Sequence, residues 1–293
     1  MNTYFAAIEG GGTKFNCAII DKERKVLVSR RIDTRTPEYT IGETITFFKQ
    51  QQEAGYHFSQ LGLASFGPID LQPQSKTYGY ITKTPKPSWS NTPIVGQLQS
   101  ALNCNVVIDT DVNAAALAEC KWGAAKHTSV SVYVTVGTGV GVGIVINGET
   151  LKGLVHPELG HMLIPAPEGI KGVCPFHGNC VEGLASGKAM SDIWGTPAET
   201  LADDHRAWDV QGQVLAKLAH NLTISYSPER IIFGGGVMAK PGLLDRVIKY
   251  TEESLSGYVV FPKEIDLQHI IQRPGLGEFS GLFGALALVI DKG

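Results

Sequence analysis

The sequence predicts an α/β protein built from two halves, and three observations lead to this prediction. A strand, a glycine-rich turn and a second strand follow one another near residue 10, and the same order returns near residue 138. The 293 residues are enough for two domains that each bury a core. No low-complexity linker separates the halves. We therefore expect two domains on either side of a cleft.

Composition and charge narrow the classes of protein to which the chain can belong. Hydrophobic residues make up 43% of the chain and charged residues 18%, as in ordinary globular proteins. A net charge of −3 does not favour nucleic acid or an anionic membrane as a partner, and no apolar stretch is long enough to span a bilayer. We expect no signal peptide, and the five cysteines lack the spacing of a disulfide framework. The expected location is the cytoplasm, where thiols stay reduced.

The first half combines strands and helices with a proline-rich loop. Apolar alternation and apolar periodicity predict its elements. These are strands at 4–9, 14–20, 26–32, 61–65 and 105–108, and helices at 38–54 and 113–121. Pro85, Pro87 and Pro93 break the chain between the last two strands into a long loop, which is more often functional than idle.

The second half repeats the strand pair and adds longer helices. Its predicted elements are strands at 130–136, 140–146 and 230–233, a long amphipathic helix near 207–225 and a last helix near 281–290. The expected domains are residues 1–118 and 119–280, with the C-terminal helix, residues 281–293, packed on the first domain.

Three glycine clusters stand at the ends of predicted strands. Backbone N–H groups of a turn without side chains can point together at an anion, and a nearby hydroxyl or ammonium group adds to phosphate binding. A single turn of this kind suits a tight hairpin equally well, whereas three together favour a nucleotide. The candidate contacts are Gly11, Gly12, Thr13, Lys14, Thr138, Gly139, Gly235 and Gly236.

Two familiar nucleotide motifs are absent. The sequence lacks the Walker A pattern G-x4-G-K-[ST]. The first two glycine clusters lead into a strand and not into a helix, which distinguishes them from a Rossmann fingerprint. The third cluster is expected to enter a helix, where an adenosine contact is as natural as a dinucleotide one.

Residues 156–182 hold a compact set of borderline-soft metal ligands. HPELGH is followed by twelve residues and then by CPFHGNCVE, and His156 rivals a later histidine as the fourth ligand. The alternative is two histidines and two buried thiols without a metal. Glu158 precedes His161 by three residues, so on a helix the two side chains would share a face. The candidate ligands of a tetrahedral zinc site are His161, Cys174, His177 and Cys180.

Asp109 and Asp111 stand where a predicted strand ends and a helix begins. Either aspartate could cap that helix, which is the commonest role of aspartate at this position. Asp111 equally suits a general base that accepts the proton of an attacking hydroxyl in phosphoryl transfer. Local sequence alone does not separate the two roles.

Together these segments resemble the ROK family of sugar kinases and related repressors, and the resemblance runs over nearly the whole chain. The matching segments are 9–14 for the first phosphate motif, 109–116 for the catalytic aspartate, 137–141 for the second phosphate motif, 158–161 with 174–182 for the sugar-and-zinc signature, 233–237 for the adenosine motif and 275–285 for the C-terminal end.

The resemblance implies a fold, a reaction and a set of site residues. The implied fold is the actin-like ATPase fold, with two ribonuclease-H-like halves around a cleft. ATP with Mg²⁺ is the implied phosphoryl donor, Asp111 the base that deprotonates a sugar hydroxyl, and Zn²⁺ the ion held by the four candidate ligands. A homodimer is also implied. The implied sugar contacts are Asn91, Glu158, His161 and Glu182.

Two departures from the family pattern point to one branch of the family. The first motif opens with Glu9 where aspartate is usual, which leaves the placement of Mg²⁺ open. The zinc loop has His177 where a cysteine is common. Both features are similar to the zinc-containing bacterial fructokinases, so D-fructose is the expected acceptor and its 6-hydroxyl the expected site of phosphorylation.

Three other functions compete with a fructokinase. A kinase for glucose, mannose or another hexose is close, because the sugar contacts discriminate weakly. The repressors of the family carry a helix-turn-helix domain ahead of the first phosphate motif, and here only eight residues precede Glu9. A silent sugar-binding protein is disfavoured because Asp111 and both phosphate turns are present.

Overall fold

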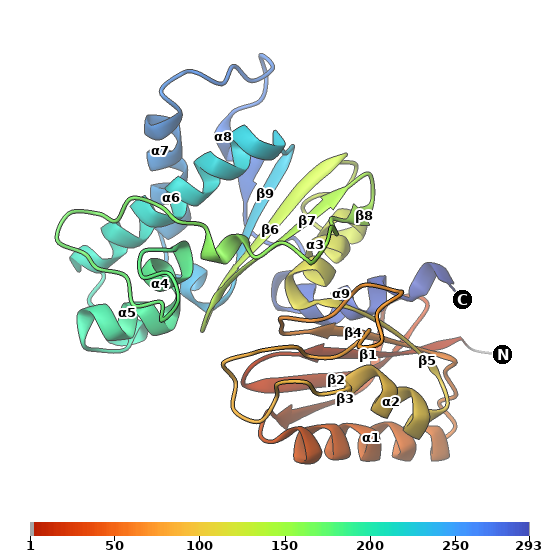
Figure 1. Cartoon of the computed structure of the whole chain (residues 1–293). Helices are drawn as coiled ribbons and strands as arrows, with labels where there is room; N and C mark the ends of the chain where they lie inside the picture. Colours follow the sequence, from red (N-terminus) through yellow and green to blue (C-terminus); the bar gives the residue numbers. More distant parts are fainter. Residues whose placement is uncertain (1–2, 293) are drawn as a thin grey trace. The chain divides into compact units, whose positions relative to one another are not determined.

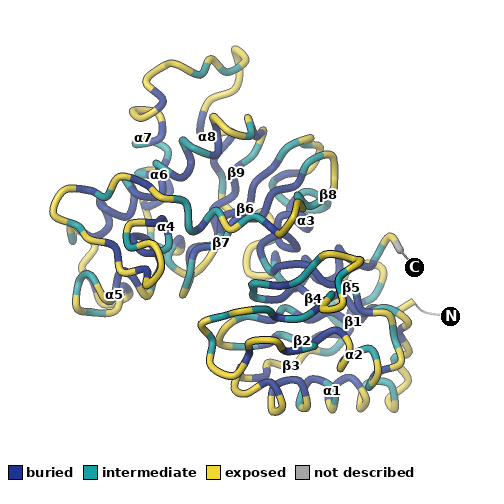
Figure 2. The backbone as a smooth tube through the Cα atoms, viewed as in Figure 1, coloured by how far each residue is buried: buried dark blue, intermediate teal, exposed yellow. Residues whose placement is uncertain are grey.

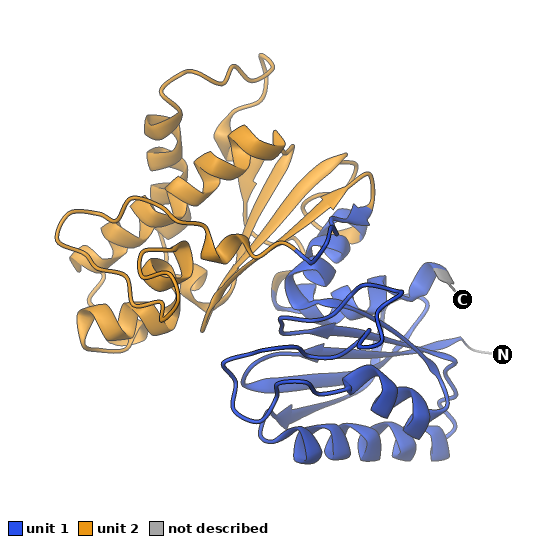
Figure 3. Cartoon of the chain, in the orientation of Figure 1, with its two compact units in different colours: residues 1–121, 149–156, 278–293 blue, residues 122–148, 157–277 orange. Residues whose placement is uncertain are grey.

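The computed structural model describes residues 3–292, which form two compact units (Figure 3). Unit 1 comprises residues 1–121, 149–156 and 278–293, and unit 2 comprises residues 122–148 and 157–277. Whether these units are the folding domains expected from the sequence stays a prediction. None of the described helices is both long and apolar enough to cross a bilayer.

Two five-stranded sheets organise the protein (Figure 1). The first has the order β3-β2-β1-β4-β5 and the second the order β10-β9-β6-β7-β8. The first sheet contains β1 Tyr4–Gly10, β2 Lys14–Asp21, β3 Val26–Asp33, β4 Gln60–Ser65 and β5 Asn105–Thr110. The second contains β6 Val130–Val136, β7 Val140–Ile146, β8 Glu149–Thr150, β9 Arg230–Gly234 and β10 Ile271–Gln272.

Helices and single 3-10 turns connect these strands. The α-helices are α1 Pro37–Glu53, α2 Ile94–Leu102, α3 Asp111–Trp122, α4 Val181–Ala185, α5 Gly187–Trp194, α6 Arg206–Tyr226, α7 Leu243–Leu255, α8 Leu267–Ile270 and α9 Ser280–Ala287. The 3-10 turns are η1 Leu159–His161, η2 Ala198–Thr200, η3 Gly236–Ala239, η4 Gly277–Phe279 and η5 Ile290–Lys292.

The repeat expected from the sequence is present as a repeat of topology. β1 pairs antiparallel with β2 and parallel with β4, and β6 pairs in the same two ways with β7 and β9. Each hairpin closes over one of the first two glycine clusters. The α/β fold predicted from the sequence is therefore confirmed.

Helices cover both faces of the sheet in unit 1. In Figure 1, α1 and α2 lie on one face and α9 on the other. Contact with α9 is close because Gly62 of β4 has no side chain: a Cβ there would lie 1.8 Å from the carbonyl oxygen of Ala285. Thr36 caps α1 by accepting a hydrogen bond from Tyr39 N at 3.4 Å, and Pro37 begins the helix.

The proline-rich loop of unit 1 is anchored by a tryptophan. Trp89 is completely buried, and its ring packs against Phe15 and Phe66 with centroid distances of 5.7 and 5.2 Å. Its Nε1 donates to Arg35 O at 2.7 Å, so the buried indole N–H is satisfied. The loop therefore has a fixed point two residues before Asn91.

In unit 2, the long helix α6 packs along α7 beside the second sheet (Figure 1). Figure 2 shows the central strands of both sheets as mostly buried. Two helices expected from the sequence are shorter than predicted. Glu158 precedes a single 3-10 turn, η1, and the third glycine cluster enters the 3-10 turn η3, because α7 begins only at Leu243.

Candidate active site

The first glycine turn joins β1 to β2 and is held by one hydrogen bond of its own backbone and by two side chains of unit 1. Gly11 N donates to Lys14 O at 2.8 Å, and Gly11 O accepts from Thr34 Oγ1 at 2.8 Å. Lys86 Nζ of the proline-rich loop donates to Gly12 O. No atom lies within 4 Å of a Cβ built on Gly12, so packing in unit 1 does not require this glycine. Close approach of a ligand to the backbone is a reason for it.

Glu9 precedes this turn and is largely buried. Its Oε2 accepts a hydrogen bond from Asn16 Nδ2 at 2.7 Å on the paired strand β2. Burial raises the pKa of the Glu9 carboxyl, while the Asn16 hydrogen bond and the charge of Lys14 act in the opposite direction. A Cβ on Gly281 would lie 2.1 Å from Glu9 Oε1, so the glycine makes room for the glutamate.

Asp109, Thr110 and Asp111 lie between the end of β5 and the start of α3, and each has different hydrogen-bond partners. Thr110 caps the helix, because its Oγ1 accepts from Asn113 N at 3.1 Å. Asp109 is completely buried and accepts from Thr110 N at 2.8 Å and Asn113 Nδ2 at 2.9 Å. Asp111 is the first residue of α3, is partly exposed, and its Oδ1 accepts from Val112 N at 2.9 Å. The capping role that competed with the catalytic one therefore belongs to Thr110.

Asn91 lies in the proline-rich loop with an exposed side chain. Its φ of 61° is in the left-handed region, which asparagine tolerates better than most residues. Its backbone N donates to Thr82 O at 3.3 Å. The loop therefore fixes the backbone of Asn91 and leaves its amide group exposed.

The second glycine turn joins β6 to β7. Thr138 is exposed at its tip, and Gly137 O accepts from Gly187 N at 2.7 Å at the start of α5. Val140 N, just after the turn, donates to Glu182 Oε2 at 3.0 Å. A Cβ on Gly139 would lie 2.6 Å from the same oxygen. The turn is therefore held on both sides by residues of the segment that carries α4 and α5.

The third glycine cluster, residues 234–236, begins at the last residue of β9, and two of its glycines are required by packing. Gly235 has a φ of 91°, and a Cβ there would lie 2.4 Å from Val136 O. A Cβ on Gly234 would lie 2.4 Å from the Tyr133 hydroxyl. Gly236 has no atom within 4 Å of such a Cβ. Of the three glycines, only Gly236 therefore has no packing reason to lack a side chain.

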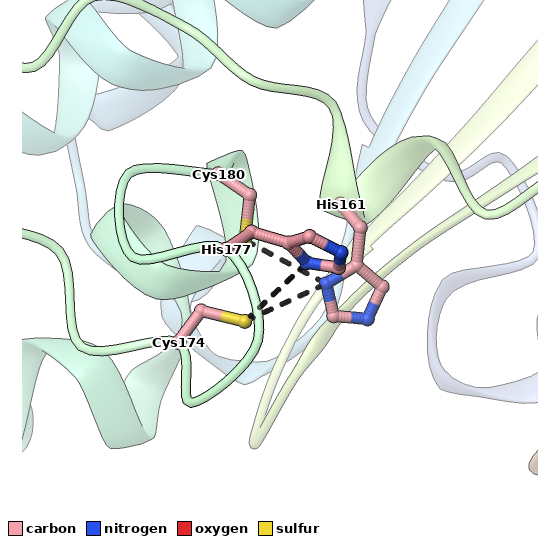
Figure 4. A group of neighbouring side chains, drawn as sticks. All are labelled: His161, Cys174, His177 and Cys180. Atoms are coloured by element: carbon pink, nitrogen blue, oxygen red, sulfur yellow. Dashed lines mark hydrogen bonds between the residues drawn. The ribbon is translucent and has the colours of Figure 1, made fainter.

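Four predicted metal ligands converge in unit 2 (Figure 4). One ligand atom from each lies within 4.8 Å of all the others. His161 Nδ1 lies 3.6 Å from Cys180 Sγ and 3.9 Å from Cys174 Sγ, and His177 Nδ1 lies 3.6 Å from Cys174 Sγ. Nitrogen and sulfur ligands of a tetrahedral zinc ion stand about 3.5 Å apart. The side chains therefore fit a metal ion of this size.

The loop geometry explains how these ligands meet. Gly178 has a φ of 59°, which turns the chain between His177 and Cys180. Cys180 caps α4, its Sγ accepting from Gly183 N at 3.3 Å. Burial raises the pKa of the Cys180 thiol to about 11, so a metal would have to displace its proton on binding.

His156, the rival ligand, is not part of this group. The group found among residues 3–292 contains His161 and does not contain His156. His156 is buried, and its Nε2 accepts a hydrogen bond from Ile69 N at 3.1 Å. Spacing along the chain could not reveal this, because the partner of His156 is distant in sequence.

The remaining predicted sugar contacts surround His161. Its Nε2 lies 3.8 Å from Glu182 Oε1, while Glu158 is exposed and its carbonyl oxygen accepts from His161 N at 2.9 Å. A Cβ on Gly160 would lie 1.8 Å from Val140 O, so η1 rests directly on β7. Unit 2 thus brings His161 and Glu182 together, and Glu158 lies three residues before His161 in the sequence.

Three features of these sites were not expected from the sequence. They are the hydrogen bond from Lys86 to the first glycine turn, the burial of Asp109, and the hydrogen bond that Glu182 accepts from the second glycine turn. Each depends on a partner far along the chain. Lys86 lies among prolines and Glu182 lies in a ligand-rich loop, and both positions suggest a function. Neither position predicts which backbone atom the side chain contacts.

The paired sheets and their glycine hairpins define the class of protein: this is the actin-like ATPase fold. A solved ROK hexokinase from Thermus thermophilus superposes with a TM-score of 0.78 at 25% identity, covering 100% of this chain and 99% of that one. The ROK family profile matches residues 5–292, and the chain belongs to the ROK family.

Two relatives extend this result. A fructokinase of Zymomonas mobilis subsp. mobilis is 46% identical over 292 residues, covering 98% of this chain and 96% of the relative. A fructokinase of Lactococcus lactis subsp. cremoris is 41% identical over 269 residues, covering 91% and 90%. The resemblance found in the sequence, to the ROK family and within it to fructokinases, is confirmed.

Proposed function

We propose that the protein is an ATP-dependent fructokinase that converts D-fructose to fructose 6-phosphate. The observation that carries the proposal is the 46% identity to a fructokinase along 98% of the chain. The site supports it, because three glycine clusters lie at strand ends and the partly exposed Asp111 begins a helix. These are the parts that phosphoryl transfer requires, since this reaction depends on positioning and charge stabilisation.

The proposed reaction uses Asp111 as the general base. Its carboxylate accepts the proton of the sugar 6-hydroxyl while the sugar oxygen forms a bond to the γ-phosphorus of ATP. The bond from the γ-phosphorus to the β,γ-bridging oxygen breaks, and ADP leaves. Backbone N–H groups at Gly11, Gly12 and Gly139, with the side chains of Lys14 and Thr138, hold the phosphates. Bound Mg²⁺ supplies further neutralisation of the phosphate charge.

The remaining contacts complete the proposed site. Thr13 joins the first phosphate turn, and Gly235 and Gly236 lie against the adenosine. Asn91, Glu158, His161 and Glu182 hydrogen-bond the sugar. Zn²⁺ is held by the four converging ligands, whose spacing fits it, and cross-links the loop that carries His161. We also propose that the protein acts as a homodimer in the cytoplasm.

A coupled assay of ADP release tests the function. Purified protein with ATP and Mg²⁺ is offered fructose, mannose, glucose and N-acetylated hexosamines in turn. We expect the highest kcat/KM with fructose, and phosphorus NMR of the product should place the new ester on the 6-position. Preference for another hexose would keep the kinase and replace the acceptor. No ADP with any sugar would favour a silent sugar-binding protein.

A further inference from the structure

One carboxylate of unit 2 lies between the metal-ligand group and the second glycine turn. Glu182 Oε2 accepts a hydrogen bond from Val140 N at 3.0 Å, directly after the turn. Glu182 Oε1 lies 3.8 Å from Nε2 of His161. The two oxygens of one side chain thus face two different parts of the site.

The two ring nitrogens of His161 are likewise directed at different partners. Its Nδ1 points at the thiols of Cys174 and Cys180, at 3.9 and 3.6 Å, as Figure 4 shows. Its Nε2 points at Glu182. A histidine that binds a metal through one ring nitrogen commonly donates the other N–H to a carboxylate, which fixes the tautomer and the ring orientation. Glu182 Oε1 faces that nitrogen at 3.8 Å, which is within ion-pair range and longer than a hydrogen bond.

The turn is shaped to admit this carboxylate. A Cβ on Gly139 would lie 2.6 Å from Glu182 Oε2, so any larger residue would push the carboxylate away from Val140 N. Glu182 is also held from its own side, because α4 begins at Val181, directly after the ligand Cys180. Glu182 therefore lies two residues after the candidate ligand Cys180, in the first turn of the helix that Cys180 caps.

We propose that Glu182 is a positioning residue that couples the metal centre to the second phosphate turn. Occupation of the metal site orients His161, His161 orients the Glu182 carboxylate, and the carboxylate sets the backbone of residues 137–140 for the nucleotide phosphates. This coupling rests on the proposed function for its nucleotide. It adds that zinc controls binding of ATP as well as binding of the sugar.

The test measures binding of a non-hydrolysable ATP analogue with Mg²⁺ by titration calorimetry, on zinc-loaded and zinc-free protein. For the wild type we expect the dissociation constant to rise about tenfold when zinc is removed. Hydrogen exchange of the peptide covering residues 137–140 should quicken at the same time. Equal binding by both forms would overturn the coupling. A wild type that binds no nucleotide in either form would overturn the proposed function together with it.

Two variants and one control isolate the carboxylate. Glu182→Ala should bind the analogue about tenfold more weakly than the wild type and lose its response to zinc. Gly139→Ala keeps every metal ligand and should weaken nucleotide binding while its zinc content stays at the wild-type value. Glu168→Ala removes an exposed carboxylate of the preceding loop and should match the wild type. Wild-type nucleotide binding by a folded, zinc-loaded Glu182→Ala or Gly139→Ala protein would exclude the role.

Discussion

Asp109 and Lys152 form an ion pair in unit 1, with 3.0 Å between Asp109 Oδ2 and Lys152 Nζ. The aspartate carboxylate is fully buried, whereas the lysine side chain is 45% exposed. Thr150 Oγ1 donates to the same oxygen at 2.8 Å. One buried carboxylate therefore joins the start of α3, where Asp111 lies, to the segment of residues 149–156.

This relationship predicts unequal effects of replacing its two partners. Asp109→Asn removes the charge and places an NH₂ group among donors, so the free energy of unfolding should fall by about 2–4 kcal/mol. Lys152→Met leaves the buried Asp109 charge with its hydrogen bonds but without its cation, and it should cost less than Asp109→Asn, about 1–2 kcal/mol, because water can reach the exposed lysine position. Urea unfolding at constant m-value measures both changes. Equal losses in the two variants would contradict the assignment of Asp109 as the buried centre.

Asp111→Asn should remove turnover without removing the fold. The amide cannot accept the proton of the sugar hydroxyl, so kcat should fall by about 10²- to 10⁴-fold while the ATP analogue binds as before. Steady-state kinetics and calorimetry of the same preparation separate the two effects. Because Thr110 provides the helix cap, the melting temperature should change little. Turnover near that of the wild type would remove Asp111 from the mechanism.

Removal of zinc should affect the sugar site. The four ligands converge on one point, so a chelator should release close to one zinc ion per chain, and the loop of residues 173–180 should become sensitive to protease. Sugar affinity should fall, because His161 loses its fixed orientation. Cys174→Ser should mimic the chelated protein, whereas Cys104→Ser, outside the ligand group, should not. A demonstrably zinc-free protein with unchanged sugar affinity would refute this role.

Glu9 predicts a pH-dependent cost in stability. Its pKa in the folded protein is raised above the ordinary value of 4.5, chiefly by burial. The folded state then binds more protons than the unfolded state between these two pKa values, so stability falls as pH rises through that window. Glu9→Gln removes the charge at nearly the same size and should raise the unfolding free energy at pH 7. The gain should disappear below pH 4.5.

Glu9→Gln should also lose kinase activity at pH 7. A variant that is more stable and less active would show that the Glu9 charge serves function at a cost in stability. Glu23→Gln, on an exposed turn, provides the matched control and should change neither property. If Glu9→Gln and the wild type unfold at the same urea concentration at every pH, burial of the charge is not the cause of the shift.

The hairpins and the convergence of the four candidate ligands could be predicted because their signals are local. Alternating apolar residues flank Gly10–Gly12 and Gly137–Gly139, and strand pairing follows from the short turn between them. The helix α2 was not predicted, because it begins after Pro93 with no side-chain cap and lies beyond an irregular loop. Sequence signals for such a helix are weak.

Contacts between distant segments could not be predicted in the same way. His156 and His161 are equally suitable ligands by spacing, and only the folded chain shows that Ile69 N donates to His156. The hydrogen bond from Val140 N to Glu182 could not be predicted either, because the sequence does not indicate which backbone group a carboxylate will contact. Glu158 precedes the 3-10 turn Leu159–His161 where a helix was expected, so the helical face that Glu158 and His161 were predicted to share is absent.

Because Gly281 leaves space for the Glu9 side chain, the substitutions tolerated at these two positions depend on each other. Asn16 holds the Glu9 carboxylate in place, so a methyl group at 281 cannot simply push it aside. A mutational scan of position 281 alone will therefore favour glycine strongly, although the constraint comes from packing against Glu9. A library that removes the Glu9 side chain beyond its Cβ in the same molecules relieves all three close contacts and opens position 281 to alanine, and the two effects will not add.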